Sequence, residues 1–355
     1  MNAPLLDDLH RAAGARLAGA PPRPLTFGDV PGEYAAARAG AALFDRTDRG
    51  SVRVTGGEAA AFLHRLLANA VRTLAPGQGN RNLLLSSKGK VLFDFELAVG
   101  EGGVDLSTTP GSAARLIQAL DMYHFTEDVA FEDRSQEVAP LELVGPRADA
   151  LAAEVLAGEL PAADHAWREL RLGDAPVRVT RLAVAGWPGL RLDAGPMRAA
   201  ALWNALVAAG ARPAGRVVHD SLRAEACAAE HGVDVDDSIY PQEARLEPAF
   251  SLEKGCYIGQ EVVAKIDTYG GLNKRLCTLA VEHDDPVAPG TRLFREDDGE
   301  WRDLGVVTTW AYSFARDGGV VLAYVKRRHQ EPGTRFRIGE GPATAEVIEV
   351  PLGGP

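Results

Sequence analysis

The sequence predicts an α+β protein made of two similar mixed α/β halves followed by a small antiparallel β-barrel. A strand–helix–strands–helix order of predicted elements occurs twice within about the first 209 residues. Short strand-like segments, separated by glycine and proline, follow from Asn273 onward, which is typical of a small barrel. We therefore expect a first region of residues 1–271, with subdomains of roughly 1–135 and 136–271, and a barrel of residues 272–355.

The first half begins with a helical segment and continues with a strand and a helix. About the first 25 residues are predicted to be helical, up to a proline cluster at 21–24, because proline interrupts the helical hydrogen-bond ladder. Ser51–Thr55 alternates in polarity and stops at Gly56, as a half-buried strand followed by a turn does. Glu58–Leu67 then carries its large apolar residues on one helical face.

A hairpin, a further strand and a helix complete the first half. Asn82–Ser86 and Val91–Val99 are predicted strands, and the glycine of the intervening Ser87–Lys90 segment suits a tight turn. Val104–Thr108 adds a strand and Ser112–Tyr123 a helix. Because the same order then recurs, we expect the second half to have a similar fold.

The second half and the C-terminal region follow from the same patterns. The repeated order runs from about Ala139 to Ala209, and His219–Glu230 is a predicted helix. Gly232–Gly271 shows little periodicity, and such a long irregular segment inside a compact domain is usually functional. The predicted barrel strands are Arg275–Val281, Thr291–Phe294, Asp303–Trp310, Gly319–Val325 and Arg335–Val350.

Composition limits the classes of partner and compartment. Of 355 residues, 49 are acidic and 38 basic, and the resulting net charge of −11 disfavours nucleic acid and anionic membranes as main partners. The three cysteines, Cys227, Cys256 and Cys277, have no Cys-x-x-Cys spacing and do not form a disulfide framework. No secretory signal is recognisable, and no segment approaches the about 18 apolar residues of a membrane span. We expect a cytoplasmic protein.

The segment most informative about chemistry is Lys254–Glu261, which reads Lys-Gly-Cys-Tyr-Ile-Gly-Gln-Glu. Cys256 stands between two glycines, which allow close approach to a ligand, and the nearby Lys254 ammonium favours a nucleophilic thiolate. Tyr257 offers an aromatic face. The alternative is that Cys256 is a small buried residue in a turn, since free cysteine is often buried. The sequence contains no Walker loop, dinucleotide fingerprint, nucleophile elbow or zinc-ligand pair, so no metal ligands are predicted.

This segment resembles the signature of the YgfZ family and its mitochondrial iron–sulfur relatives, which belong with the T-protein of the glycine cleavage system. Three further pairs of segments are similar to T-protein motifs, and with the octapeptide they span about residues 40 to 330. These pairs are Gly50–Gly56 with Asn69–Val71, Leu222–Ala226 with Pro241–Ala244, and Gly305–Thr309 with Val321–Val325.

The resemblance implies an architecture, a cofactor and binding residues. It implies two mixed α/β subdomains of T-protein type and a C-terminal antiparallel barrel around a central folate-binding opening, with tetrahydrofolate as cofactor. Glu225 is at the position of the glutamate that binds the pterin, where a carboxylate can accept two adjacent N–H donors. The alternative for Glu225 is a helix-surface carboxylate. Lys254 or Arg245 is expected to hold the folate tail, and Tyr257 is a further candidate contact.

The sequence departs from the T-protein at two places that concern chemistry. The T-protein has an Asp-Asp pair that assists one-carbon transfer, whereas this chain has Phe93-Asp94 there. Asp94 is a candidate folate contact or general base, and its alternative is a strand-end surface acid. The T-protein also lacks a cysteine at the place of Cys256. Thr309 replaces the serine that is usual in the barrel motif, a change expected to affect packing.

Three functional hypotheses follow. The first is a tetrahydrofolate-binding protein that supports iron–sulfur cluster assembly or repair, with client or assembly proteins as partners. In it, Cys256 attacks a one-carbon adduct, forms a mixed disulfide or ligates cluster iron. The second is a folate-dependent one-carbon transferase, an aminomethyltransferase or demethylase, with Asp94 as base or cation stabiliser. The third is a non-catalytic scaffold that retains the folate pocket. In all three, Cys227 and Cys277 are packing residues.

Overall fold

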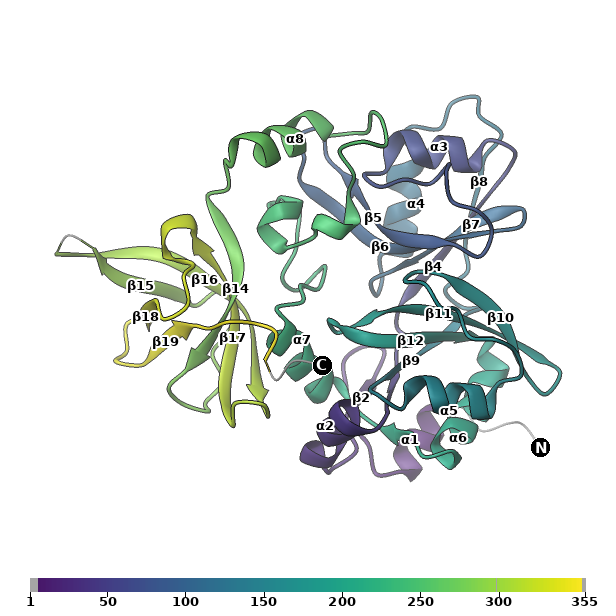
Figure 1. Cartoon of the computed structure of the whole chain (residues 1–355), viewed down its shortest axis with the longest axis horizontal. Helices are drawn as coiled ribbons and strands as arrows, with labels where there is room; N and C mark the ends of the chain where they lie inside the picture. The colour runs from purple at the N-terminus through teal and green to yellow at the C-terminus, as the bar shows by residue number, and fades with distance from the viewer. Residues whose placement is uncertain (1–5, 298, 353–355) are drawn as a thin grey trace. The chain divides into compact units, whose positions relative to one another are not determined.

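The computed structural model describes residues 6–297 and 299–352, which form two compact units. The first unit contains the described residues up to Leu84, together with Phe93–Val218 and Ala249–Tyr257. The second contains Leu85–Leu92, His219–Pro248 and the chain from Ile258 onward. The elements of both units are labelled in Figure 1.

The two predicted halves are present in the first unit, each as a sheet with two helices. The first half has the sheet order β5-β6-β7-β4-β8, and the second has β10-β11-β12-β9-β3-β13, so β5-β6-β7-β4 corresponds to β10-β11-β12-β9. The repeated order of elements is therefore confirmed. The first half comprises β4 (Gly50–Thr55), α3 (Ala59–Leu66), β5 (Gly79–Leu85), β6 (Val91–Gly100), β7 (Gly103–Thr108), α4 (Ala113–Asp121) and β8 (Ala130–Asp133). The second comprises β9 (Ala139–Val144), α5 (Ala148–Val155), β10 (Trp167–Leu172), β11 (Ala175–Val184), β12 (Trp187–Ala194) and α6 (Pro196–Ala208), joined by β3 (Ala42–Asp45) and β13 (Arg212–Pro213).

Each of these sheets has one apolar and one polar face. In the second half, alternate strand residues such as Leu141 and Leu190 are buried in one cluster with the apolar residues of α5 and α6. Many of the residues between them are charged or polar, and the same alternation holds in β4 and β7. Across the polar faces, Arg53 of β4 and Arg178 of β11 both contact Asp105 of β7, each at 2.7 Å. Ion pairs therefore join the polar faces of the two halves.

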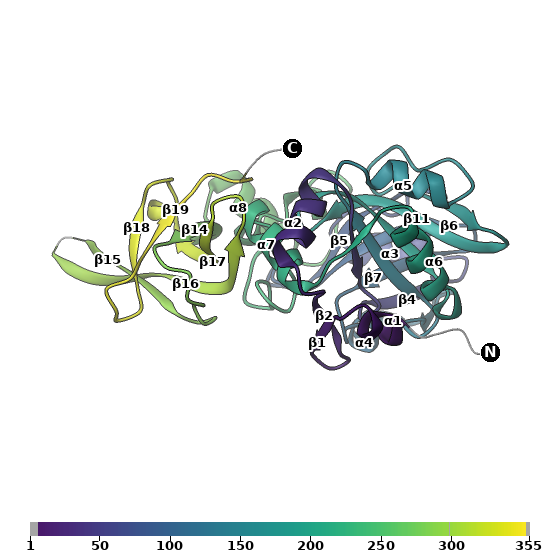
Figure 2. The same cartoon turned by 90° about the horizontal axis from the view of Figure 1, so that it is seen from below.

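The N-terminal region differs from its prediction. The predicted helix ends at Ala12 instead of near residue 25, because Gly14 adopts a φ of 79° that a right-handed helix cannot contain. Helix α1 (Leu6–Ala12) is followed by the paired strands β1 (Arg16–Ala18) and β2 (Arg23–Thr26) and then by α2 (Val30–Ala39), as Figure 2 shows. His10 of α1 is fully buried and lies 2.9 Å from the Asp45 carboxylate, which fixes α1 against β3.

The predicted C-terminal antiparallel barrel is confirmed as a closed barrel of six strands in the second unit. The predicted strand from Arg335 to Val350 is instead two strands, since Gly339 takes a φ of 57° and turns the chain between them. Apolar residues such as Leu279, Val321 and Phe336 fill the barrel interior. The strands are β14 (Lys274–Val281), β15 (Arg292–Asp297), β16 (Glu300–Ser313), β17 (Gly318–Lys326), β18 (Arg335–Ile338) and β19 (Thr344–Val347), with the short helix η3 (Arg327–His329) after β17.

The segment before the barrel contains a helix that the sequence did not predict. After α7 (Arg216–Ala226) come the 3₁₀ helices η1 (Pro241–Ala244) and η2 (Glu247–Ala249), and then α8 (Gln260–Tyr269). The prediction of an irregular segment up to Gly271 is therefore wrong from Gln260 onward. The apolar residues Val262, Ile266 and Tyr269 recur at helical spacing, but the helix is short and buries only Val263, so the periodic signal is weak.

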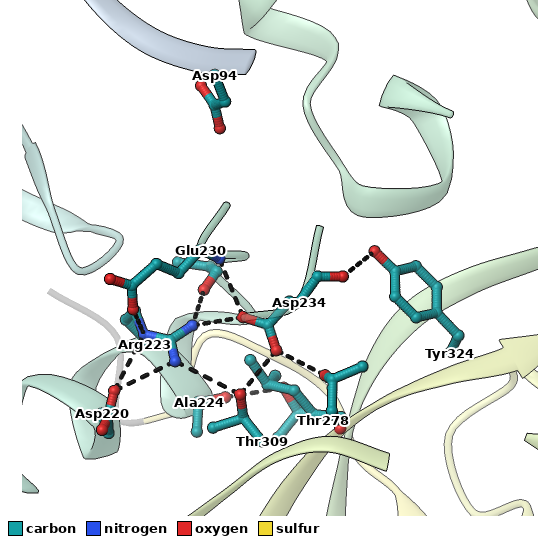
Figure 3. A network of polar contacts seen from close by, with 12 residues as sticks. Asp94, Asp220, Arg223, Ala224, Glu230, Asp234, Thr278, Thr309 and Tyr324 are labelled. Atoms are coloured by element: carbon teal, nitrogen blue, oxygen red, sulfur yellow. Dashed lines mark hydrogen bonds and ion pairs between the residues drawn. The ribbon is translucent and has the colours of Figure 1, made fainter. Parts of the chain in front are cut away.

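A buried ion pair connects α7 to the loop that follows it. The Arg223 guanidinium donates to the Asp234 carboxylate at 2.6 Å, and their side chains are 3% and 0% exposed (Figure 3). Glu230 accepts at 3.2 Å from Arg223 and donates its own backbone N–H to Asp234 at 3.0 Å. The buried Arg223 charge is thus paired with carboxylates of the second unit.

The same carboxylate also attaches this loop to the barrel. Strand β16 has one extra residue relative to β17 between Val307 and Thr309, which is a β-bulge at Thr308. Successive strand residues normally face opposite sides, but the bulge lets Thr308 and Thr309 both donate to Asp234 Oδ1, at 2.6 and 2.7 Å. Tyr324 of β17 donates to the backbone oxygen of Asp234 at 2.9 Å (Figure 3).

We expect Asp234→Ala to lower the free energy of unfolding by about 3–5 kcal/mol, because it removes the fully buried partner of Arg223 and the shared acceptor of Thr308 and Thr309. Urea unfolding monitored by circular dichroism measures the change. Asp237→Ala, at an exposed carboxylate three residues later, is the matched control and should change stability by about 0.5 kcal/mol or less. Equal stability of the two variants would contradict the structural role of the ion pair.

Candidate functional site

The first part of the Lys254–Glu261 segment is held against α3 and the loop after it in the first unit. The backbone N–H of Ser251 donates to Ala68 at 2.9 Å. The Lys254 ammonium donates to the backbone oxygen of His64, and His64 Nε2 lies 3.1 Å from the backbone oxygen of Lys254. These reciprocal bonds fix the backbone immediately before Cys256.

The two partners of His64 select one neutral tautomer. Nδ1 accepts from the backbone N–H of Val71 at 3.1 Å, so this nitrogen carries no proton. Nε2 faces a carbonyl oxygen and therefore carries the proton. Burial lowers the pKa of His64, and the nearby Lys254 charge lowers it further. The ring is thus kept neutral, as a hydrogen-bonding spacer between Val71 and the cysteine segment.

Lys254 and Tyr257 are in contact, as their sequence spacing allows. The Lys254 ammonium lies 5.0 Å from the centre of the Tyr257 ring, within the range of a cation–π interaction. Burial lowers the pKa of Lys254 to about 8, and burial raises the pKa of Tyr257 to about 12. The Tyr257 hydroxyl is buried and has no hydrogen-bond partner among the described residues. A buried hydroxyl left unpaired is costly, which makes it a candidate ligand contact.

Cys256 is exposed, and the structure thereby contradicts the alternative that it is a buried turn residue. Gly255 before it takes a φ of 105°, a conformation that favours glycine. Cys227 and Cys277 are buried, as expected of packing residues. Burial raises the pKa of both thiols, that of Cys277 to about 11, which makes them poor nucleophiles at neutral pH.

Asp94 is buried in β6 and held by an arginine of the neighbouring strand β5. Arg81 donates to both carboxylate oxygens, through Nε at 2.8 Å and Nη2 at 2.5 Å. Burial alone would lower the pKa of Arg81, but the Asp94 charge raises it instead. The Asn69 side chain donates to the backbone oxygen of Arg81 at 3.1 Å. The alternative that Asp94 is a surface acid is therefore wrong, since Asp94 is 6% exposed.

Glu225 and Arg245 belong to the second unit, where each has its own partners. Glu225 is fully buried, which contradicts the alternative of a helix-surface carboxylate. Its Oε1 accepts from Ser313 Oγ at 2.7 Å and from the backbone N–H of Ala315 at 3.1 Å. Arg245 is exposed and donates through Nε to the backbone oxygen of Leu276 at 2.8 Å.

The last glycine of the octapeptide packs against the hairpin turn after β5. A Cβ on Gly259 would lie 2.5 Å from the backbone oxygen of Ser86, and Gly259 has a φ of 81°. Only glycine therefore fits this position. A Cβ on Gly89 of the same turn would lie 3.0 Å from Val262 of α8. These two glycines allow α8 and the hairpin turn to approach closely.

Sequence reasoning missed three residues of these clusters. His64 lies on the polar side of a predicted helix, Arg81 precedes the predicted first strand of the hairpin, and Lys90 lies in its turn. Lys90 lies 3.1 Å from the centre of the Tyr240 ring and 3.8 Å from the Glu243 carboxylate. Their charged or titratable side chains were the available signal, but nothing in the sequence indicates which carboxylate or ring each one contacts.

Among residues 6–297 and 299–352, no group of three His, Cys, Asp or Glu side chains could hold a metal ion. Within the same described ranges, no helix is both long and apolar enough to cross a membrane.

Comparison with known proteins gives consistent matches along the chain. A family model described as the GCVT N-terminal domain matches residues 6–254, and one described as the glycine cleavage T-protein C-terminal barrel domain matches residues 274–352. An aminomethyltransferase of Rubrobacter xylanophilus is 32% identical, over 98% of this chain and 93% of its own. A putative chloroplastic transferase of Arabidopsis thaliana is 26% identical, over 88% of this chain and 71% of its own. The solved structure of the glycine cleavage system aminomethyltransferase T from Bartonella henselae is 26% identical, with a TM-score of 0.85, covering 98% of this chain and 96% of that one.

We expect the Lys254 amine to react with an acylating reagent half-maximally near pH 8, because burial lowers its pKa to about 8. Mass spectrometry of the Lys254 peptide after a short pulse at each pH measures the midpoint. The matched control is the same lysine in the urea-unfolded protein, whose midpoint should move toward the ordinary lysine pKa of 10.5.

The sign of the associated stability change follows from these two pKa values. Between about pH 8 and 10.5 the unfolded chain binds more protons at Lys254 than the folded chain, so this lysine makes the protein more stable as the pH rises through that range. Identical acylation midpoints in the folded and unfolded chains would show that the ammonium is solvated and that the pocket around it is open.

Proposed function

Because the chain belongs to the glycine cleavage T-protein family, we propose that it binds tetrahydrofolate and transfers a one-carbon unit to it from an amine donor. The family match over both the N-terminal region and the barrel supports this proposal. So do the names of relatives that align along nearly their whole length, which are aminomethyltransferases. The observation that carries the chemistry is Asp94, a buried carboxylate fixed by Arg81.

We assign Asp94 to charge stabilisation rather than to proton abstraction. Both of its oxygens already accept charge-assisted hydrogen bonds from Arg81, at 2.8 and 2.5 Å. A carboxylate held in this way is fixed in position and orientation, so it can act on a nearby charge without rearranging. Positive charge that develops on the donor amine during transfer is therefore stabilised by a preorganised carboxylate.

Tetrahydrofolate supplies the nucleophilic nitrogen that receives the one-carbon unit, and the chain has side chains suited to it. The unpartnered, buried Tyr257 hydroxyl is a polar group that a ligand can satisfy. The pKa of Lys254, about 8, leaves most of its ammonium charged at neutral pH, as the carboxylate tail of a folate requires. Arg245 is exposed and is a second cation proposed for that tail.

Glu225 is proposed as the pterin anchor. A buried carboxylate can accept the adjacent N–H donors of an aminopyrimidine side by side. Ser313 and Ala315 already donate to Oε1, so their bonds orient the carboxylate that the pterin would meet. Because the same bonds attach α7 to the end of β16, substitution of Glu225 has to be tested for stability as well as for binding.

The two roles predict different losses. Asp94→Asn should lower the rate of aminomethyl transfer to tetrahydrofolate about 100-fold or more, with a folate Kd within a few-fold of wild type, since the fixed anion acts on the transition state. Glu225→Gln should weaken tetrahydrofolate binding about 10- to 100-fold, because it loses a charge-assisted acceptor pair. Formation of methylenetetrahydrofolate and isothermal titration calorimetry measure the two effects.

Asp149→Asn, which removes an exposed carboxylate paired with Arg181, is the matched control and should leave rate and Kd unchanged. Thermal unfolding of each variant separates lost folding from lost function. Wild-type protein that binds tetrahydrofolate but forms no methylenetetrahydrofolate would remove the transferase proposal and retain the folate site. Absence of folate binding in the wild type would remove both.

A second candidate function is support of iron–sulfur cluster assembly or repair, as in YgfZ-type proteins, with folate bound and Cys256 as the reactive group. The specific observation in its favour is the exposure of Cys256. The backbone before this thiol is fixed through His64 and Lys254, which presents it in a defined place to a client protein. A transferase of the kind proposed above has no step that needs this cysteine.

Cells whose own copy is deleted and replaced by Cys256→Ser should then lose activity of iron–sulfur enzymes, while purified Cys256→Ser keeps wild-type folate affinity. Enzyme activities in extracts and calorimetry provide the two measurements. Cys277→Ser, at a buried thiol, controls for general loss of a cysteine. Full activity of the iron–sulfur enzymes in Cys256→Ser cells would exclude this candidate and leave the transferase.

A further inference from the structure

The polar faces of the two halves of the first unit enclose a cavity of about 300 Å³. Its floor is formed by buried residues, among them Gly50, Ala98 and Arg191, and its rim by exposed ones such as Glu137 and Glu169. The cavity is therefore lined by both buried and solvent-exposed residues. A volume of this size lies at the lower end of small-ligand sites.

Two side chains that line this cavity have polar atoms without hydrogen-bond partners in the part of the chain that the structure describes. One side chain has unpartnered donors and the other has an unpartnered acceptor. Arg191 of β12 is 3% exposed, and its Nε and Nη1 have no hydrogen-bond acceptor among the described residues. Asp193, two residues along the same strand, has an Oδ1 that is buried and accepts no hydrogen bond within the described part of the chain. Arg191 Nε and this oxygen are 3.3 Å apart, as an ion pair without the alignment of a hydrogen bond. The two charges are thus paired, but leaving these polar atoms without hydrogen bonds inside a protein is costly.

Several other charged residues that line the cavity have hydrogen-bonded partners. Arg178 contacts Asp105 at 2.7 Å, and Arg134 contacts Glu137 at 2.8 Å. Arg191 and Asp193 face the same side of the sheet, since they alternate with the buried Leu192. The unmet groups thus concentrate at one place, with donors on one side chain and an acceptor on the next.

We propose that this cavity binds a small zwitterion of the α-amino acid type. The ligand carboxylate accepts from Arg191 Nη1, and the ligand ammonium donates to Asp193 Oδ1. A simple anion would satisfy Arg191 but lie beside the Asp193 carboxylate, which repels it. A simple cation would satisfy Asp193 but lie beside the Arg191 guanidinium, which repels it. A zwitterion satisfies both and adds no net charge to the buried interface. This site is independent of the folate proposal, because none of its residues takes part in that chemistry.

The test measures ligand-dependent thermal stabilisation and calorimetric binding, with glycine and L-alanine as probes at millimolar concentrations. Both should raise the melting temperature of the wild type in a concentration-dependent way. Acetate and methylammonium, which carry the two charges separately, should each give little or no shift. Asp193→Asn should weaken glycine binding about ten-fold or more, because it replaces the charged acceptor of the ammonium.

Two further variants make the result specific. Ala98→Leu fills the cavity without changing its charges and should abolish the response to glycine, so the test does not depend on Asp193→Asn folding normally. Asp174→Asn, at a carboxylate that is 88% exposed in the same half, should leave the response unchanged.

Three results would overturn the proposal. Stabilisation by acetate equal to that by glycine would identify an anion site. A glycine response that persists in Ala98→Leu would place binding elsewhere. Absence of any response in folded wild type would mean that ordered water alone fills the cavity.

Discussion

The second unit depends on the Asp234 carboxylate, which connects three segments distant in sequence. One oxygen accepts from Arg223 of α7 and the other from Thr308 and Thr309 of the barrel (Figure 3). Such a buried pair contributes little net stability compared with an apolar contact of the same shape, but it is intolerant of mispairing. We interpret the pair as a source of structural specificity, because it lets α7 pack on the barrel in one register only. That register determines where Glu225, two residues beyond Arg223, contacts Ser313.

In the first unit, the two sheets are also joined by partly buried polar contacts. Each sheet covers its apolar face with its own helices, so the faces that meet are polar and are joined by ion pairs such as Arg178–Asp105. Charged faces cannot be packed as densely as apolar ones, because every group needs a partner in the correct geometry. A cavity with unmet groups at Arg191 and Asp193 is the expected consequence of such an interface. The cavity therefore forms where the polar faces of the two repeated halves meet, and no dedicated loop is needed to form it.

The features that the sequence predicted correctly are determined by residues that are close together in the chain. The alternation in Ser51–Thr55 and the repeated order of elements depend on neighbouring residues, and both were recognisable. Helix α8 was missed because it buries only Val263, and the early end of α1 because a single Gly14 reverses the chain. The partners of the candidate site were not predictable for a different reason. The contact of Arg81 with Asp94 depends on strand register, and that of Lys254 with His64 joins residues 190 positions apart.

The state of Asp94 bears on what kind of chemistry a single acid can support. The expected pair of aspartates is reduced here to one, and this one is bound by Arg81 at both oxygens. A carboxylate that arginine holds at both oxygens is fixed in position and acts through its field. Proton transfer must then come from the substrate, from water or from another group. Lys254, whose pKa of about 8 lies close to neutrality, is the side chain near the cysteine segment best suited to exchange a proton. Under the proposed one-carbon transfer, Asp94 therefore acts as a fixed charge and not as a proton acceptor.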